Sequence, residues 1–391
     1  MSGDEYNGTL SSATFSGNVK FTIGDEDLQA IGAFDHAVIP YSDIVSMENV
    51  SYTVNVKTEK SSFTVSKLGL QCDAFYERLY AAFNRKVLRA FFVDSSPLFK
   101  TYGEYRYTES ETSSSGKAAI QLYENCICIL PPNDEGRRIP LCFAVGIDRK
   151  PFEFTLSLDN GNNYTFIRLG HDLDLLYDAI YKQLLALREK TMAAVLTIDG
   201  DMSNLEAMTV AKMIPEGIAA PVGELETASK TFVFAVESKI WESRAGGGYE
   251  TLRGICDQKK MCVGIKFGLA GEKSDDGIIW IITPGKAEGV AAVEFAVKEE
   301  AAATFIYRYD TTWDMFRKDL NRAMEAIAFR REVIRLTDDE LNKRDNSDYA
   351  MAVKRTAALR FIRNCFAGRV IHSTPENWGR EINDRLTNPK F

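Results

Sequence analysis

The chain has 391 residues, of which 45% are hydrophobic, and this is enough apolar material for about two to four ordinary domains. Its formal net charge of -8 disfavours nucleic-acid binding through a general basic field. Because no apolar run approaches the roughly 20 residues that span a bilayer, the start is polar and acidic, and the seven cysteines are scattered, we expect a cytoplasmic protein with reduced thiols.

Residues 1–92 alternate apolar and polar side chains and then change to a helical period. The alternation predicts a hairpin with arms at 52–56 and 63–65 and a turn at 59–61. The helix that follows carries apolar residues at helical spacing, namely Phe75, Tyr76, Leu79, Phe83 and Val87. We expect this helix to cover one face of a sheet.

Residues 93–192 show the same order of patterns. Strand patterns at 102–107 and 118–130, separated by a linker-like stretch at 109–116, precede a hairpin that turns at Asn160-Gly161, where both residue types tolerate positive φ. Asp172 is a plausible N-cap for the closing helix. Its apolar positions are Leu173, Leu176, Tyr177, Ile180, Leu184 and Leu187.

The two segments share landmarks at a spacing of 100 to 101 residues. The matching pairs are Ile39-Pro40 with Ile139-Pro140, Leu68-Gly69 with Leu169-Gly170, Tyr76 with Tyr177, and Leu79 with Ile180. A constant spacing over different kinds of element indicates an internal duplication. We therefore call residues 1–92 the first repeat and residues 93–192 the second repeat.

Residues 193–245 are predicted to be a helical connector, with a capping box from Ser203 to Glu206. The glycine-rich residues 244–248 predict a hinge. In residues 246–334, alternation from Met261, an apolar strand at 278–282 and a hairpin formed by 293–297 and 305–309 precede an amphipathic helix that begins near Trp313. This segment is predicted to be a third, diverged copy with one covering helix.

Residues 335–391 are predicted to be a helical tail that starts at a capping box, Thr337 to Glu340, and continues to about residue 366. Residues 373–391 are polar, and we expect them to be loosely held. The tail helix is the candidate partner-binding element, through the apolar residues Tyr349, Val353 and Phe361 and the basic residues Lys354, Arg355, Arg360 and Arg363. Such a helix can meet a protein partner, an anionic membrane, or the third copy of its own chain.

Each repeat of about 100 residues is predicted to form a partly open antiparallel barrel that one C-terminal helix closes. This arrangement resembles the pleckstrin-homology-like superfold, including its bacterial and GRAM-type members. The resemblance implies an α+β chain with three such domains, at 1–92, 93–192 and 246–334. Members that bind phosphoinositides use Lys and Arg in the loop joining the first two strands. Here we assign that loop to residues 24–27 and 110–115, which carry acidic and hydroxyl side chains, so no lipid-binding residue is transferred.

We find no pattern that predicts catalysis, a metal site or a cofactor. Cys126 and Cys128 are spaced as neighbours on one strand face, and residues 268–277 lack the glycine-lysine order of a phosphate loop. We therefore expect a non-enzymatic adaptor or scaffold that binds a protein. The alternatives are a peripheral membrane protein that uses the basic tail and, third, an enzyme of unknown class. The oligomeric state is left open.

Overall fold

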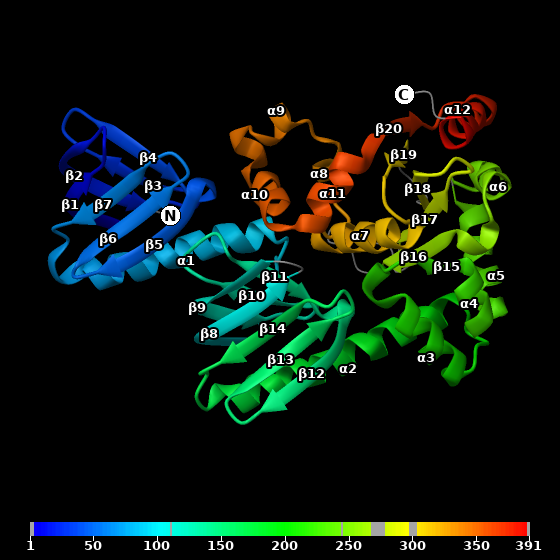
Figure 1. The fold of residues 1–391 in the computed structure, drawn as a ribbon, viewed down its shortest axis with the longest axis horizontal. Helices are drawn as coiled ribbons and strands as arrows, with labels where there is room; N and C mark the ends of the chain where they lie inside the picture. Colours follow the sequence, from blue (N-terminus) through cyan, green and yellow to red (C-terminus); the bar gives the residue numbers. More distant parts are fainter. Residues whose placement is uncertain (1–3, 110–111, 244, 267–277, 297–302, 389–391) are drawn as a thin grey trace. The chain divides into compact units, whose positions relative to one another are not determined.

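The computed structural model describes residues 4–109, 112–243, 245–266, 278–296 and 303–388. These residues form a mixed α+β structure with three antiparallel sheets (Figure 1). The chain divides into two compact units, one made of Met1–Ile180 with Thr337–Arg355 and the other of Tyr181–Leu336 with Thr356–Phe391. We call them the first unit and the second unit.

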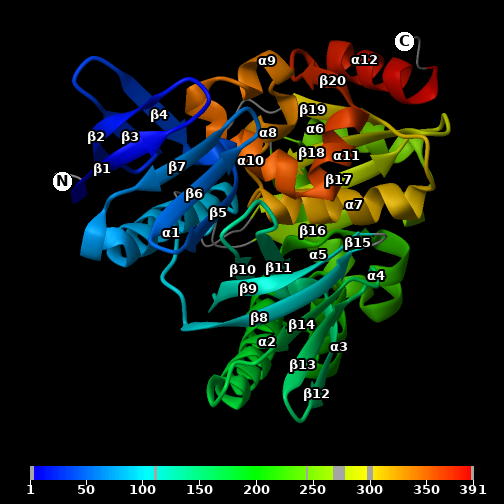
Figure 2. The same cartoon turned by 60° about the vertical axis from the view of Figure 1, so that its left-hand side comes forward.

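The first repeat forms a seven-stranded sheet in the order β4-β3-β2-β1-β7-β6-β5, followed by one helix (Figures 1 and 2). Inward residues such as Val54 and Val56 alternate with more exposed ones, and the helix buries Phe75 and Leu79 against them. The elements are β1 (Asp4–Ser11), β2 (Ser16–Ile23), β3 (Asp27–Ile31), β4 (His36–Pro40), β5 (Ile44–Val50), β6 (Thr53–Thr58), β7 (Ser62–Ser66) and α1 (Cys72–Ala90).

The second repeat has the same strand order, β11-β10-β9-β8-β14-β13-β12, and again one helix follows its last strand. Ile180 on this helix is buried like Leu79 on α1. The equal strand order is the architecture that the spacing of 100 residues predicts. The elements are β8 (Phe99–Glu109), β9 (Thr112–Leu122), β10 (Cys126–Leu130), β11 (Arg137–Pro140), β12 (Ala144–Lys150), β13 (Glu153–Leu158), β14 (Asn163–Ile167) and α2 (Asp172–Ile198).

Of the two loop assignments from the sequence, that of the first repeat is wrong and that of the second repeat is too long. The first strand, β1, lies in the polar N-terminal stretch, so residues 12–15 join the first two strands. Residues 24–26 join β2 to β3, and Asp27 begins β3. The alternation of β1 is hidden because an inward position holds Gly8, where a Cβ atom would lie 2.8 Å from the Ser66 carbonyl oxygen. In the second repeat the assigned loop is correctly placed between the first two strands, but β9 begins at Thr112 and includes most of the stretch predicted to be a linker.

The two repeats pack on each other within the first unit. Cys126, Cys128 and Leu130 of β10 belong to the same apolar core as Phe83 and Val87 of α1. Burial of both cysteines agrees with the expectation of apolar thiols at this strand.

The second unit contains connector helices and a six-stranded sheet in the order β15-β16-β17-β18-β19-β20. Its strands are β15 (Ala220–Pro221), β16 (Cys262–Lys266), β17 (Ile278–Pro284), β18 (Val290–Ala296), β19 (Ala303–Arg308) and β20 (Phe366–Ile371). Its helices beyond α2 are α3 (Asn204–Met213), α4 (Val222–Ala228), α5 (Lys230–Glu242), α6 (Gly246–Ile255), α7 (Trp313–Ala326), α8 (Glu332–Arg335), α11 (Ala357–Cys365) and α12 (Pro375–Thr387).

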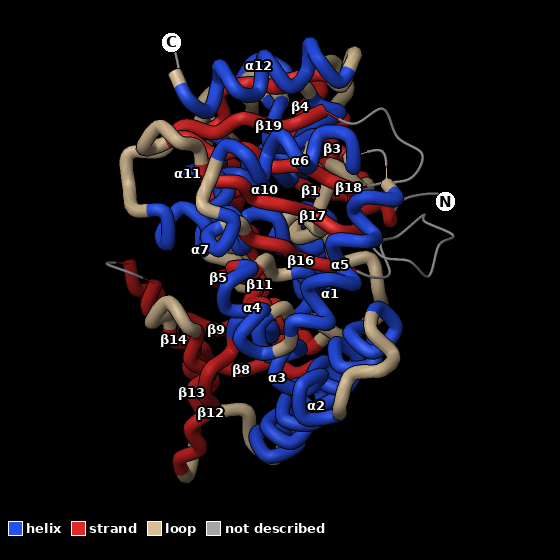
Figure 3. The backbone as a smooth tube through the Cα atoms, turned by 90° about the vertical axis from the view of Figure 1, so that its right-hand side faces the viewer, coloured by secondary structure: helices blue, strands red, loops and turns tan. Residues whose placement is uncertain are grey.

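This third sheet differs from the predicted copy with one covering helix, because helices lie on both of its faces (Figures 1 and 3). Ile281 packs in a core with residues of α5, α6 and α12, whereas Trp280, which points to the other face, contacts Phe329 near the end of α7. Strands buried on both faces carry near-continuous apolar runs, and β17 and β18 have this character. The predicted loop at 268–277 lies outside the described residues.

The glycine-rich segment is helical from Gly246, which corrects the predicted hinge. A Cβ atom on Gly248 would lie 2.2 Å from Cη2 of Trp378, so glycine allows the indole ring to contact the helix backbone. The predicted loose C-terminus is also wrong, because α12 places Trp378, Ile382 and Leu386 at helical spacing and buries all three. Residue 244 lies outside the described residues.

The tail is not one continuous helix to residue 366. It forms α9 (Asp338–Leu341) and α10 (Ser347–Arg355) in the first unit, and α11 and the strand β20 in the second unit. Lys343 and Thr356 have extended backbone angles that interrupt the helix. Packing overrides local propensity here, since α10 packs on α1 and α11 packs on α7. No helix of the described residues is long and apolar enough to cross a membrane.

Candidate binding site on the first repeat

Seven tail residues are predicted from the sequence to bind a partner, and in the structure they lie on two separate helices. Tyr349, Val353, Lys354 and Arg355 lie on α10, in the first unit, and Arg360, Phe361 and Arg363 lie on α11, in the second unit. The seven residues therefore do not form one continuous helix face. The candidate site described below uses the first group, whose surroundings belong to a single compact unit.

Each residue of the first group meets the first repeat or borders it. The ring of Tyr349 lies 5.9 Å from the ring of Phe92, and Lys354 forms an ion pair with Glu59. The guanidinium of Arg355 lies 5.9 Å from the centre of the Phe83 ring, and burial lowers its pKa to about 10. In the other group, Arg363 donates a hydrogen bond to the carbonyl oxygen of Val333.

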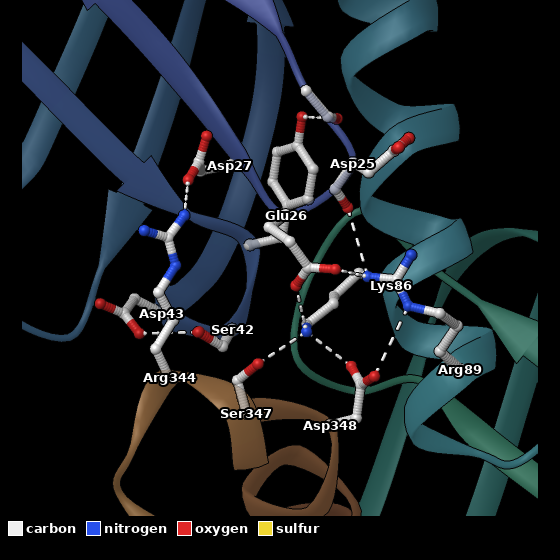
Figure 4. Close-up of polar contacts among 12 residues, drawn as sticks. Asp25, Glu26, Asp27, Ser42, Asp43, Lys86, Arg89, Arg344, Ser347 and Asp348 are labelled. Carbon is white, nitrogen blue, oxygen red and sulfur yellow. Dashed lines mark hydrogen bonds and ion pairs between the residues drawn. The ribbon is translucent and has the colours of Figure 1, made fainter. Parts of the chain in front are cut away.

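The centre of the site is a buried ammonium group on α1. Lys86 has only 2% of its side chain exposed, and its Nζ atom lies 2.6 Å from Glu26, 2.7 Å from Ser347 and 2.6 Å from Asp348 (Figure 4). The ammonium group thus donates hydrogen bonds to Glu26 and Ser347 and forms an ion pair with Asp348. Ser347 and Asp348 belong to α10, and Glu26 belongs to the acidic loop between β2 and β3. The buried Lys86 of α1 therefore binds both the tail and this loop.

The acidic loop at residues 24–27 also contacts the tail directly. Arg344 donates a hydrogen bond of 2.7 Å from Nη2 to Oδ2 of Asp27, whose side chain is buried. Tyr41 stabilises the loop by donating a hydrogen bond of 3.0 Å from its hydroxyl group to the Gly24 carbonyl oxygen. Burial, followed by the charge of Asp27, raises the pKa of the Tyr41 phenol, which keeps it a neutral donor.

Glu26 and Asp348 also share a second cation. Arg89, one helical turn beyond Lys86 on α1, forms ion pairs with Glu26 and, at 3.5 Å, with Asp348. Two carboxylates and two cations therefore alternate around one point, with one member from the loop, one from α10 and two from α1 (Figure 4). Such a network compensates the desolvation of Lys86 better than one isolated pair would.

A cleft of about 550 Å³ separates the first repeat from the tail next to these contacts. The wall formed by the first repeat carries four carboxylates together with the ammonium group of Lys86, and the charged residues of the tail wall are all cations. The acidic residues are Glu26, Asp27, Asp43 and Glu59, and the basic residues of the tail are Lys343, Arg344 and Lys354. Opposite charges on facing walls give complementarity, which selects a partner more than it adds raw affinity. We call Glu26, Asp27, Glu59 and Lys86 the tail site.

The tail site could not be assigned from the sequence, although one signal for it is present. Lys86 lies between Phe83 and Val87 in the apolar face of α1, and the equivalent position on α2 holds Leu187. A lysine in an apolar stripe, where the other repeat has leucine, indicates a buried charge with a partner. Nothing local indicates that this partner lies 261 positions away at Ser347.

The site carries chemistry for recognition of charged groups. The side chains that line the cleft include carboxylates, ammonium groups, a guanidinium and hydroxyls, and no histidine or cysteine. Among the described residues, no group of three or more His, Cys, Asp or Glu side chains is placed to hold a metal ion. No model of a known protein family matches the chain, and no curated protein sequence matches it either.

Proposed function

We propose that the protein is a non-enzymatic cytoplasmic adaptor or scaffold whose first repeat binds a charged helical segment of a protein. The observation that carries this proposal is the tail site, which holds α10 of the same chain through the buried Lys86 and through Arg344. A surface that accepts one helix of suitable charge is available to a second helix of the same chemistry whenever the first is released.

The bound segment has a definite charge pattern. Arg344 meets the acidic loop, Asp348 meets Lys86, and Lys354 meets Glu59. A partner segment would therefore carry a cation, an anion about one turn later, and a second cation beyond it. Apolar contact comes from Met351, which belongs to the same apolar core as the residues of the first repeat.

We further propose that the two repeats are pleckstrin-homology-like domains. In each repeat the first strand lies in the middle of the sheet, beside the last strand, and a single helix closes the fold. Residues 12–15, which join the first two strands, are Ser, Ala, Thr and Phe and supply no cation for a phosphoinositide. The third sheet is not part of this proposal, because helices cover both of its faces.

The structure lends less support to the membrane alternative. Lys354 is paired with Glu59, Arg355 is largely buried, and Arg363 is bonded to a backbone carbonyl. Binding to anionic lipid requires cations that share one exposed face. The basic residues of the tail are instead divided between α10 and α11.

A peptide that copies residues 337–355 tests the proposed function. We would label it and measure fluorescence anisotropy with the full chain carrying Arg344→Glu, which weakens the hold on its own tail. We expect the peptide to bind this variant at least tenfold more tightly than the wild-type chain, whose tethered tail competes at high effective concentration. The control peptide carries Asp348→Arg, which places a cation against Lys86. Equal binding of both peptides, or no binding, would exclude the tail site as a protein-binding surface.

A further inference from the structure

The contact between the two repeats includes a strand edge. A segment of the β10–β11 loop lies along β5, the last strand of the first sheet, and forms an isolated antiparallel bridge between Asn133 and Ser46. Met47 donates a backbone hydrogen bond of 2.8 Å to Pro132, and Asp134 donates one of 2.9 Å to Val45. The loop of one repeat thus satisfies backbone groups at the open edge of the other.

The equivalent edge of the second repeat is open. Strand β12 has the same position at the end of its sheet and the same register shift, between Ala144 and Gly146, as β5 has between Ile44 and Ser46. The counterparts of Val45 and Met47 are Val145 and Ile147. In the described part of the chain neither residue has a backbone hydrogen bond outside the ladder between β12 and β13, and Val145 is 67% exposed.

The β3–β4 loop of the first repeat is the counterpart of the β10–β11 loop, and it is exposed. Residues 32–35 stand where residues 131–134 stand in the second repeat, so Ala33 and Asp35 are the counterparts of Pro132 and Asp134. Phe34, the counterpart of Asn133, is 99% exposed. No backbone bond of the described residues uses the Ala33 carbonyl or the Asp35 N–H group.

The side chains beside the loop differ between the repeats in the same way. Leu130, next to the loop of the second repeat, is fully buried, and its carbonyl oxygen accepts a hydrogen bond from Tyr80. Ile31, the counterpart of Leu130, is 49% exposed. Within the described part of the chain, the first repeat therefore leaves exposed the surface that the second repeat uses to join the first.

We propose that the chain associates head-to-tail with further copies of itself, so that the loop at residues 32–35 of one copy lies along β12 of the next. Ile147 N–H then donates to the Ala33 carbonyl, and Asp35 N–H donates to the Val145 carbonyl. The ring of Phe34 lies opposite Gly146, where a Cβ atom would meet nothing within 4 Å. An aromatic side chain across from an edge glycine covers backbone that is otherwise exposed.

A second copy is the occupant that the structure favours, because the contact continues an interface already present between the repeats. A two-fold pairing of β12 with β12 would need a regular edge, and the bulge at Val145 interrupts it. The head-to-tail contact uses two different surfaces, so it does not close on itself as a two-fold dimer does. The loop at 32–35 is two residues shorter than the loop at 131–136, and we expect association to depend on concentration.

Sedimentation velocity of the full chain at increasing concentration tests this association. We expect the mean mass of the wild type to rise past that of a dimer. Phe34→Asp blocks the loop, and Ile147→Pro removes the edge donor at a position where proline suits an edge strand. Each variant alone should stay monomeric, with self-association at least tenfold weaker, whereas Ile147→Ala, which keeps its N–H group, should behave like the wild type.

Mixing the two blocked variants gives the decisive result. Phe34→Asp retains the edge and Ile147→Pro retains the loop, so an equimolar mixture should form a one-to-one dimer and nothing larger. Gly146→Asp, which fills the space opposite Phe34, replaces Ile147→Pro if thermal unfolding shows that the proline variant is misfolded. A wild type that stays monomeric, a mixture that stays monomeric, or a Phe34→Asp variant that forms dimers would each overturn the proposal. This association does not rest on the tail site, and its failure would leave the peptide experiment intact.

Discussion

Arg344 and Asp27 are separated by 317 positions in the sequence, and Nη2 of Arg344 lies 2.7 Å from Oδ2 of Asp27. The aspartate is buried, whereas 77% of the arginine side chain is exposed. The acceptor is therefore fixed by the fold of the first repeat and the donor reaches it from the tail. The first repeat therefore supplies a fixed binding surface, and the segment that binds to it supplies the exposed, movable side chain.

Replacement of Lys86 by alanine should destabilise the first unit by about 2 to 3 kcal/mol, because it removes the buried ammonium group with its hydrogen bonds to Glu26 and Ser347 and leaves Arg89 to pair with Glu26 and Asp348. Arg89→Ala is the matched control on the same helix. It removes a cation that contacts the same two acids but is 35% exposed, so we expect a loss of about 1 kcal/mol or less. Denaturant titrations measure the free energy of unfolding of both variants. An equal decrease in the two would show that Lys86 does not stabilise the first unit more than Arg89 does.

Truncation of the covering helices should leave cavities. Leu79, Ile180 and Leu320 are fully buried on α1, α2 and α7, and replacement of each by alanine should cost about 2 to 5 kcal/mol. Lys182→Ala on the exposed side of α2 should have little effect. Urea unfolding curves that did not separate the three core variants from the Lys182 variant would show that these helices are packed differently.

Two neighbouring glycines of α6 should respond in opposite directions to alanine. Gly248→Ala places a methyl group into the ring of Trp378 and should lower the thermal midpoint of the second unit. A Cβ atom on Gly247 would meet nothing within 4 Å, so Gly247→Ala should stabilise the helix by about 0.5 to 1 kcal/mol. Thermal unfolding followed by circular dichroism distinguishes them, and a Gly248→Ala variant as stable as the wild type would disprove the close contact with Trp378.

The ion pair between Lys354 and Glu59 predicts weaker tail binding in acid. The hydrogen bond from Lys354, and then its charge, lower the pKa of Glu59 from its ordinary value of 4.5. A carboxyl group with a lowered pKa contributes stability above its unfolded pKa and loses it as the pH falls through the folded pKa. The protection factors of the α10 amides, which compare each rate with the intrinsic exchange rate at the same pH, should therefore fall below about pH 4.5. The fall should be smaller in Lys354→Ala and at high salt. If the pH dependence of α10 exchange were the same in Lys354→Ala as in the wild type, titrating groups other than Glu59 would be its cause.

Alternation and spacing predict the hairpins of the two repeats and their covering helices, because both are local properties of the sequence. The hairpin at Asn160-Gly161 and the buried positions of Leu79 and Ile180 are examples. The strand β1 is missed, since Gly8 interrupts its alternation. The partner of Lys86 is not predictable in this way, since charge pairing between α1 and α10 depends on how distant segments meet. Gly248 misleads for a related reason: glycine lowers helix propensity, and only the contact with Trp378 explains its place in a helix.

Charge reversal at Asp27 and Arg344, followed by hydrogen exchange of α10, tests the tail site most directly. Asp27→Arg should accelerate exchange of the α10 amides at least tenfold, because it sets a cation against Arg344 and removes the buried acceptor. The double variant Asp27→Arg with Arg344→Asp should recover a large part of the protection, while exchange in β6 stays unchanged throughout. If α10 exchanges at the same rate in the wild type and in Asp27→Arg, the first repeat does not hold the tail through this site and the account is wrong.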